Sequence, residues 1–119
     1  MSKTLVIGAS ENEARFSYKA IKALLKKNET VIALGKDSGQ LDGVPIQTSI
    51  STDEKVDTAT LYINPSIQTI YEEFLLELNP NRVIFNPGTE NPVLEDKLKN
   101  AGITTLNACT LVLLAANQY

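Results

Sequence analysis

Three small residues and an arginine near the start of the chain form the strongest candidate for a chemical site. Gly8, Ala9 and Ser10 directly follow an apolar run, and Arg15 and Ser17 lie where a helical pattern begins. A strand, a tight turn and a helix N-terminus in this order offer free N–H groups and the positive end of a helix dipole to an anion. Arg15 could add a bidentate bond to a phosphate, and Ser17 could donate to the same anion. The sequence therefore predicts a site for a nucleotide-like anion.

Few other residues offer catalytic chemistry. The chain contains no histidine, which excludes histidine-based acid–base catalysis, a phosphohistidine intermediate and nearly every zinc site. Cys109 is the single cysteine, and the apolar run after it favours a buried, inert thiol, although a position at a helix N-terminus would favour the thiolate. Glu11, Glu13 and Glu90 have no spacing that marks an acid–base pair. We therefore expect a binding protein with no metal site, and not an enzyme.

The elements that would position these residues alternate between strand and helix. Short β-branched runs predict five strands, and amphipathic spacing predicts the helices between them. The strands are expected at 3–7, 30–34, 58–63, 82–85 and 103–106; the helices are expected at 15–27, from a cap at Ser66 up to Pro80, at 92–102 and at 109–116. The helix after Ser66 follows the amphipathic pattern most closely, with Ile67, Ile70, Tyr71, Phe74, Leu75 and Leu78.

The segment 37–57 is the least regular part of the chain. Gly39 and Gly43 interrupt it, and the run 44–46 could form only a short edge strand around Pro45. Ser51 and Glu54 have the spacing of a capping box. We expect an abbreviated helix or an irregular connection here.

Strands separated by helices predict a single α/β domain, residues 1–119, with an open parallel sheet and helices on both faces. Such sheets bind ligands at the carboxyl ends of their strands. Polar clusters are expected at those ends: Gly8-Ala9-Ser10, Gly35-Lys36, Asn64-Pro65 and Asn86-Pro87-Gly88. Glycine, proline and asparagine are also ordinary turn residues, so each loop has a purely structural interpretation as well.

The loop after the second predicted strand limits the choice of nucleotide. Only Gly8 stands where the NAD fingerprint needs three glycines, and Gly35-Lys36 replaces the acidic residue that would bind a ribose 2′-hydroxyl. A lysine there suits a ribose with an extra phosphate, as in coenzyme A (CoA) or NADP.

Composition limits the partners. The chain has a net charge of −3 and no basic cluster, so we expect no nucleic-acid partner. No apolar run is long enough to cross a membrane and no export signal is visible, and a single cysteine fits a reducing compartment. We expect a cytoplasmic protein.

Several segments agree in order and spacing with one family: Gly8-Ala9-Ser10, Arg15-x-Ser17-Tyr18, Gly43-Val44-Pro45-Ile46, Val56-Asp57 and the Pro87-Gly88 loop followed by Ala101-Gly102-Ile103. In them the chain resembles the small CoA-binding domain proteins of bacteria, relatives of the CoA-binding domain of succinyl-CoA synthetase α subunits and ADP-forming acyl-CoA synthetases. The resemblance covers nearly the whole chain.

The resemblance implies a three-layer Rossmann-like sheet of order 3-2-1-4-5 that binds CoA. It implies a pyrophosphate near 8–10 and 15–17, the adenosine 3′-phosphate near Lys36, and further contacts from Ile63-Asn64-Pro65 and Asn86-Pro87-Gly88. Gly35-Lys36 departs from the Asn-Pro that is common in this family. The synthetases carry their phosphorylated histidine on another domain, so their reaction is not implied here.

Three functions follow from these observations. The preferred one is non-catalytic binding of CoA or an acyl-CoA, as a sensor or as the partner of an unidentified enzyme. The second is an NADP-linked oxidoreductase or a fragment of one. The third is a Rossmann-like module that makes protein contacts and binds no nucleotide.

Overall fold

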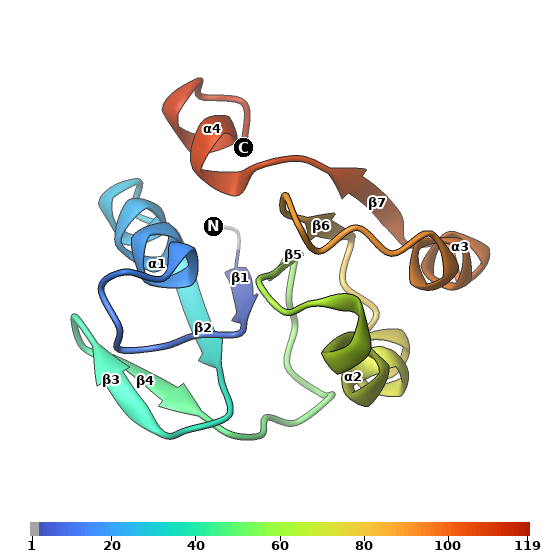
Figure 1. Cartoon of the computed structure of the whole chain (residues 1–119), viewed down its shortest axis with the longest axis horizontal. Coiled ribbons are helices and arrows are strands. Elements are labelled where there is room, and N and C mark those ends of the chain that lie inside the picture. Colours follow the sequence, from blue (N-terminus) through green and yellow to red (C-terminus); the bar gives the residue numbers. More distant parts are fainter. Residues whose placement is uncertain (1–2) are drawn as a thin grey trace.

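The apolar runs of the sequence form the centre of a sheet with helices on both faces (Figure 1). The structure, a computed structural model, describes residues 3–119. Its elements are β1 (Lys3–Ile7), α1 (Phe16–Lys26), β2 (Thr30–Leu34), β3 (Gly39–Leu41), β4 (Val44–Gln47), β5 (Thr58–Leu61), α2 (Pro65–Leu78), β6 (Arg82–Phe85), α3 (Pro92–Asn100), β7 (Thr104–Asn107) and α4 (Thr110–Ala115). Within this range, no helix is long and apolar enough to span a membrane.

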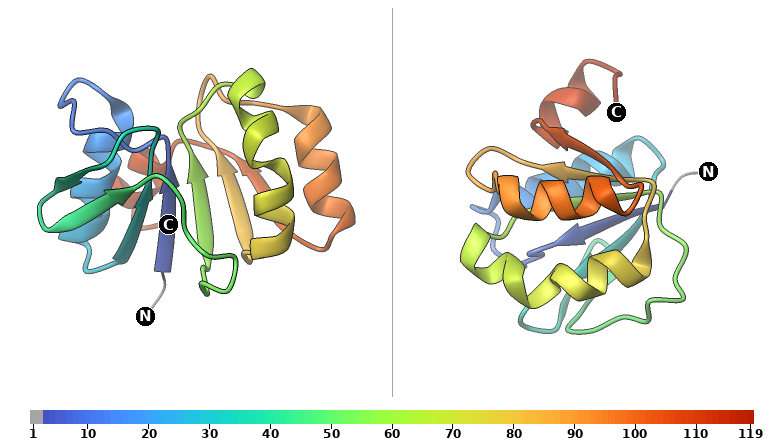
Figure 2. Two further views of the ribbon diagram at one scale, coloured as in Figure 1. Left: turned by 90° about the horizontal axis from the view of Figure 1, so that it is seen from below. Right: turned by 90° about the vertical axis from the view of Figure 1, so that its right-hand side faces the viewer.

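Side-chain alternation along β1 separates two cores. Leu5 and Ile7 pack on the face covered by α2 and α3, whereas Val6 packs on the face covered by α1 and α4. Figures 1 and 2 show these two helix layers on opposite sides of the sheet. Because both faces are covered, β1, β2 and β6 carry runs of apolar residues, and β5, with the sequence Thr-Ala-Thr-Leu, is buried along its whole length. This confirms the predicted α/β architecture.

The predicted number of strands, five, is wrong, because the sheet has seven. The two additional strands, β3 and β4, form an antiparallel hairpin in which Leu41 faces Val44, so the sheet is mixed. Between them, Asp42 and Gly43 have φ angles of 49° and 85°. Two successive positive φ angles are what a type I′ hairpin turn requires, and Asp-Gly is a typical sequence for it. The run 44–46 is thus part of a strand, β4. This strand is not at the edge of the sheet as predicted, because it lies between β3 and β2.

The predicted strand order is also wrong. The full order is β3-β4-β2-β1-β5-β6-β7. The strand predicted at 58–63 is β5. The predicted order places it beside the second strand, but it pairs with β1, with Leu5 opposite Ala59. The hairpin is the reason: β4 pairs with β2 through Ala33 and Ile46 and occupies the position that β5 would have taken.

Helix α2 begins earlier than predicted. Its cap is Asn64, whose Oδ1 accepts the N–H of Ile67 at 3.0 Å, and Pro65 takes the first helical position. Ser66 instead donates to Asn64 Oδ1. The Asn91 cap and Pro92 start of α3 are confirmed, with the Leu94 N–H 3.2 Å from Asn91 Oδ1.

The first turns of α2 do not bury the face that the amphipathic pattern marks. Ile70 is 76% exposed and Ile67 is 40% exposed, whereas Gln68 is fully buried. Gln68 Nε2 donates to the carbonyls of Ile63 at 2.9 Å and Thr89 at 2.7 Å. A buried amide with all these bonds satisfied links the loops after β5 and β6, so it outweighs the apolar periodicity there.

The segment 48–57 is an irregular connection, one of the two predicted outcomes. Ser51 Oγ accepts the N–H of Asp53 at 3.0 Å, and the Glu54 N–H lies 3.3 Å from the Ser51 carbonyl. This is a serine-stabilised turn, and residues 48–57 contain no helix.

Candidate functional site

A cleft of about 410 Å³ opens at the carboxyl ends of β1, β2 and β5. It lies where the strand order reverses, because the chain continues from β1 to one side and returns to its other side at β5. Three loops supply its lining: Gly8, Ala9, Ser10, Glu11, Asn12 and Arg15; Gly35, Lys36, Asp37 and Ser38; and Tyr62, Ile63, Asn64, Ile67 and Tyr71 with the start of α2.

Two glycines let the strand ends approach one another at the base of the cleft. A Cβ on Gly8 would lie 2.9 Å from the carbonyl oxygen of Tyr62, and a Cβ on Gly35 would lie 2.4 Å from that of Ala9. Gly8 also has a φ of 97°, which disfavours other residues. A side chain at either position would force the loops apart.

The N–H groups that are free to bind an anion are those at the start of α1, and not those of Gly8 and Ala9. The N–H groups of Gly8 and Ala9 both donate to the Leu34 carbonyl, at 2.9 and 3.0 Å, so they bind the neighbouring strand. Arg15 is the N-cap of α1, and no side chain of the described chain caps this helix. The N–H groups of its first turn are therefore available to an anion.

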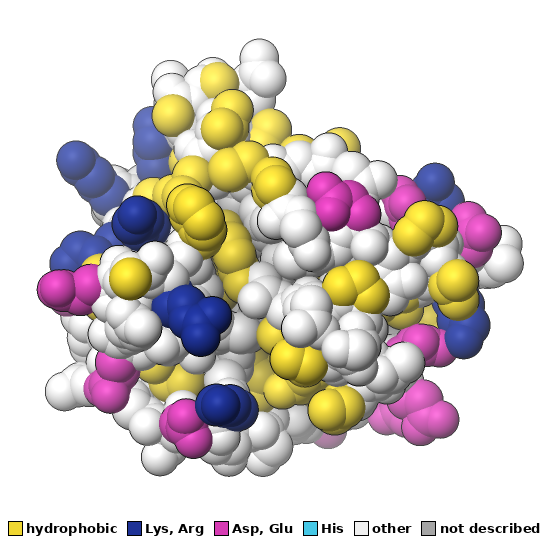
Figure 3. Space-filling model, viewed as in Figure 1, with side chains coloured by type: hydrophobic (Ala, Val, Ile, Leu, Met, Phe, Trp, Pro, Cys, Tyr) yellow, Lys and Arg dark blue, Asp and Glu magenta, His cyan; other side chains and the backbone are white. Residues whose placement is uncertain are grey.

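The cleft carries both signs of charge. Arg15 and Lys36 reach it from different loops, and both are exposed. Within residues 3–119, neither forms an ion pair. Glu11 and Asp37 also line the cleft, and the Glu11 carboxylate is bound to the N–H of Gln40. In Figure 3, Lys and Arg side chains gather mainly on the side of the molecule where α1 lies.

One wall of the cleft is apolar. Ile63 is 9% exposed, and Ile67 and Tyr71 extend this surface from the first turns of α2. This wall offers apolar contact to a ring or chain in the same cleft that Arg15 and Lys36 line.

A family model described as a CoA binding domain matches residues 2–115. The chain belongs to this CoA-binding domain family.

Several solved structures share this fold. A protein whose structure is described as uncharacterized is 42% identical, with a TM-score of 0.96 over 100% of this chain and 98% of the other. A Thermus thermophilus protein, cell-free ID.343, is 22% identical, with a TM-score of 0.85 over 99% and 90%. A dinucleotide forming acetyl-coenzyme A synthetase 1 of Ca. Korarchaeum cryptofilum, in complex with phosphate and ADP, is 18% identical, with a TM-score of 0.72 over 90% of this chain and 25% of the other. No curated protein matches the chain.

Five of the residues predicted to bind the cofactor lie outside the cleft of this CoA-binding domain: Ser17, Pro65, Asn86, Pro87 and Gly88. Ser17 is 2% exposed. Pro87 and Gly88 are exposed on the neighbouring loop, where the Gly88 N–H donates to Glu90 Oε1 at 2.9 Å. The cleft therefore brings together the other predicted residues: Gly8, Ala9, Ser10, Arg15, Gly35, Lys36, Ile63 and Asn64.

Both polar atoms of the Asn86 side chain form hydrogen bonds within the protein. Its Nδ2 donates to Thr60 Oγ1 at 2.6 Å and to the Leu61 carbonyl at 2.9 Å, and its Oδ1 accepts the Thr110 N–H at 2.9 Å. It is 2% exposed. Asn86 thus joins β5, β6 and the start of α4, and shapes this edge of the CoA-binding domain from inside.

Other cleft residues were not predicted. Of the three carboxylates considered for this crevice, Glu11 lines the cleft, and Glu13 and Glu90 do not. Asn12, Asp37 and Ser38 could have been inferred, because they adjoin predicted loop residues in the chain. Ile67, Tyr71 and Tyr62 could not, because apolar residues at helical or strand spacing indicate a core position.

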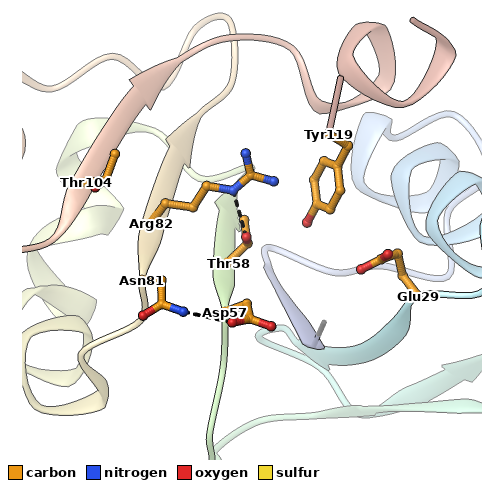
Figure 4. Close-up of a pocket in the computed structure, with 7 residues that line it drawn as sticks. All are labelled: Glu29, Asp57, Thr58, Asn81, Arg82, Thr104 and Tyr119. Atoms are coloured by element: carbon orange, nitrogen blue, oxygen red, sulfur yellow. Dashed lines mark hydrogen bonds between the residues drawn. The ribbon is translucent and has the colours of Figure 1, made fainter. Parts of the chain in front are cut away.

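A second hollow, of about 480 Å³, lies at the amino ends of the strands (Figure 4). Arg82 Nε donates to Thr58 Oγ1 at 2.8 Å, and its guanidinium lies 4.6 Å from the centre of the Tyr119 ring. Burial raises the pKa of Tyr119. Asn81 Nδ2 donates to Asp57 Oδ1 at 2.8 Å. These contacts join neighbouring elements at the edge opposite the cleft, and open α/β sheets bind ligands at the carboxyl edge.

Burial keeps the Tyr62 phenol neutral at pH 7. The Tyr62 hydroxyl is buried without a hydrogen-bond partner in the described chain, and burial raises the pKa of Tyr62 to about 12. The phenol is therefore protonated at pH 7. Cys109 is partly buried and immediately precedes α4, so its predicted full burial is not found.

Proposed function

We propose that this chain binds CoA, free or acylated, in the cleft at the carboxyl ends of β1, β2 and β5, and that it catalyses no reaction. One observation carries the proposal: the cleft joins the uncapped start of α1 and Arg15 to Lys36, in a chain of the CoA-binding domain family. Its volume of about 410 Å³ lies in the range of small-molecule sites, about 300–1,000 Å³.

The pyrophosphate of CoA would bind at the first turn of α1. The free N–H groups there and the helix dipole favour an anion, and the small residues Gly8, Ala9 and Ser10 leave space for it. Arg15 would donate to the phosphate oxygens, and a charge-assisted bond of this kind contributes about 1.5–3 kcal/mol.

The adenosine 3′-phosphate would bind Lys36, and the apolar wall of Ile63, Ile67 and Tyr71 would contact the base. The pantetheine arm would pass Asn64 and Pro65 toward the loop of Pro87 and Gly88. We place no ligand contact on Asn86 or Ser17, whose side chains are buried.

The absence of histidine and the protonated state of Tyr62 support a role without catalysis. Such a protein would act in the cytoplasm as a CoA or acyl-CoA sensor, or deliver the bound thioester to a partner enzyme.

Isothermal titration with CoA, dephospho-CoA, NADP and NAD tests the proposal. CoA should bind more tightly than dephospho-CoA, and Lys36→Ala should abolish this difference because the 3′-phosphate loses its cation. Lys26→Ala, on the exposed side of α1, is the matched control and should leave both affinities unchanged. Binding of NADP alone would indicate an NADP-linked domain instead, and no binding of any of the four would indicate a protein-interaction module.

A further inference from the structure

One side chain connects two walls of the cleft. Glu11 lies in the loop between β1 and α1, and its Oε2 accepts the backbone N–H of Gln40 in β3 at 2.9 Å. Gln40 belongs to the β3–β4 hairpin, which follows the loop that carries Lys36. The carboxylate therefore joins the loop that leads into α1 to the segment just beyond Lys36.

Gly39 gives independent support for the importance of this contact. Its φ is not positive, so the backbone conformation does not require glycine. A Cβ at this position would lie 2.6 Å from Cδ of Glu11 and 2.8 Å from its Oε2. Contacts this short are not tolerated, so a side chain at residue 39 would displace the carboxylate. The physical reason for a glycine here is the space that Glu11 occupies.

The rest of the β1–α1 loop has little to hold it in place. Residues 11–15 are all exposed. Among the described residues, the other side-chain hydrogen bonds of this loop stay within it, from the Asn12 N–H to Ser10 Oγ and from the Ala14 N–H to Asn12 Oδ1. Without Glu11, the loop that presents Arg15 would lose its side-chain attachment to the hairpin.

We infer that Glu11 is a positioning residue, which holds the Arg15 loop and the Lys36 segment at a fixed separation before the ligand arrives. This inference rests on the proposed function of the cleft. Preorganisation raises affinity because the loop is already ordered when the ligand binds. It also explains why a carboxylate lines a site for a polyanion: the Gln40 N–H holds the charge against the hairpin.

The negative charge of Glu11 should weaken binding of a polyanion, whereas its hydrogen bond to the Gln40 N–H should strengthen binding. Two variants separate these two effects. Glu11→Gln keeps an oxygen that can accept the Gln40 N–H and removes the charge, so it should bind CoA at least as tightly as the wild type. Glu11→Ala removes the charge and the attachment, and it should bind about three- to tenfold more weakly than Glu11→Gln. Gly39→Ala should weaken binding similarly, because it displaces the carboxylate without changing Glu11. Gln40→Ala keeps the backbone donor and should match the wild type.

Hydrogen exchange in the ligand-free protein provides a readout that does not depend on CoA. The amide of residue 40 should exchange faster in Glu11→Ala and Gly39→Ala than in the wild type and Gln40→Ala. Equal exchange in all four proteins, or equal CoA affinity of Glu11→Ala and Glu11→Gln, would overturn the inference.

The two proposals fail in different ways. If the wild type binds no CoA, the proposed function fails, and the positioning role fails with it. If the wild type binds CoA and the Glu11 and Gly39 variants bind it equally well, the proposed function stands and only the positioning role is lost.

Discussion

At the scale of single residues, the side chains near the carboxyl edge divide into groups that face the cleft and groups that hold the edge together. Arg15 and Lys36 are exposed cations without an ion pair in the described chain, so they are available to a ligand. Asn86 and Gln68 are amides of the kind that often bind ligands, but both are buried with their bonds made inside the protein. Residue type alone does not separate these two roles, because asparagine serves equally well in either.

Tyr62 gives a prediction about stability and pH. Its hydroxyl is buried, while the nearby Thr60 and Thr110 hydroxyls bond to each other at 2.8 Å. Because the phenol has no partner to lose, Tyr62→Phe should be as stable as the wild type at pH 8, or up to about 1 kcal/mol more stable. Urea unfolding measures this, and a clear loss of stability would show that the hydroxyl is bonded after all.

The same residue should make the wild type sensitive to alkali. The folded pKa of Tyr62, about 12, lies above the ordinary value of 10.0, so the folded state favours the neutral phenol. Its contribution to stability is complete below pH 10 and is lost as the pH rises toward 12. Between pH 9 and about 11.5, the wild type should therefore lose more stability than Tyr62→Phe. Parallel losses in the two proteins would contradict this.

At the scale of elements, Gly35 and Gly43 are required for different structural reasons. Gly35 allows the ends of β1 and β2 to approach, whereas Gly43 supplies a positive φ in the β3–β4 turn and has open space around its Cα. Gly43→Ala should therefore cost about 1 kcal/mol through backbone strain and leave the cleft unchanged. Gly35→Ala must move backbone at the base of the cleft, because its Cβ would lie 2.4 Å from the Ala9 carbonyl oxygen.

We expect Gly35→Ala to lose more stability than Gly43→Ala and also to lose CoA affinity. Urea unfolding and titration calorimetry on both variants check this. Comparable stability losses, with affinity retained in both, would mean that the loops can separate without harm to the cleft.

The helices and the hairpin also show how local signals compete. Asn91-Pro92 predicted the start of α3 correctly because the cap acts on neighbouring N–H groups. The predicted cap of α2, Ser66, is wrong, because Asn64 lies two residues earlier, also has a capping side chain, and is followed by Pro65, which fits the first helical position. The hairpin was missed although Asp42-Gly43 marks its turn, because β3 and β4 are short and contain Gly39 and Pro45.

At the scale of the whole molecule, the two edges of the sheet are different surfaces. The carboxyl edge carries the cleft with the cations Arg15 and Lys36. The amino edge carries the hollow in which Arg82 contacts Tyr119 (Figure 4). A ligand that binds the folded state alone stabilises the entire fold by an amount that depends on its concentration relative to its dissociation constant.

CoA should therefore raise the melting temperature of the protein. At 100 times the dissociation constant the stabilisation is about 2.7 kcal/mol, and dephospho-CoA at the same concentration should stabilise less because it lacks the phosphate that Lys36 would bind. Differential scanning fluorimetry across a CoA concentration series measures the shift. A melting temperature that does not change with CoA would contradict binding in the cleft.

The sequence by itself determined the α/β class, the strands at the sheet centre, the α3 cap and the loops that carry Gly8, Arg15 and Lys36. Each of these follows from local properties, namely apolar periodicity, capping side chains and turn residues, which act between neighbours in the chain. Only the tertiary structure decided the position of β5 beside β1, the burial of Gln68 and Asn86, the inward direction of the Gly8 and Ala9 amides and the contact of Glu11 with Gln40. These features depend on which distant segments pair and pack, and no local pattern contains that information.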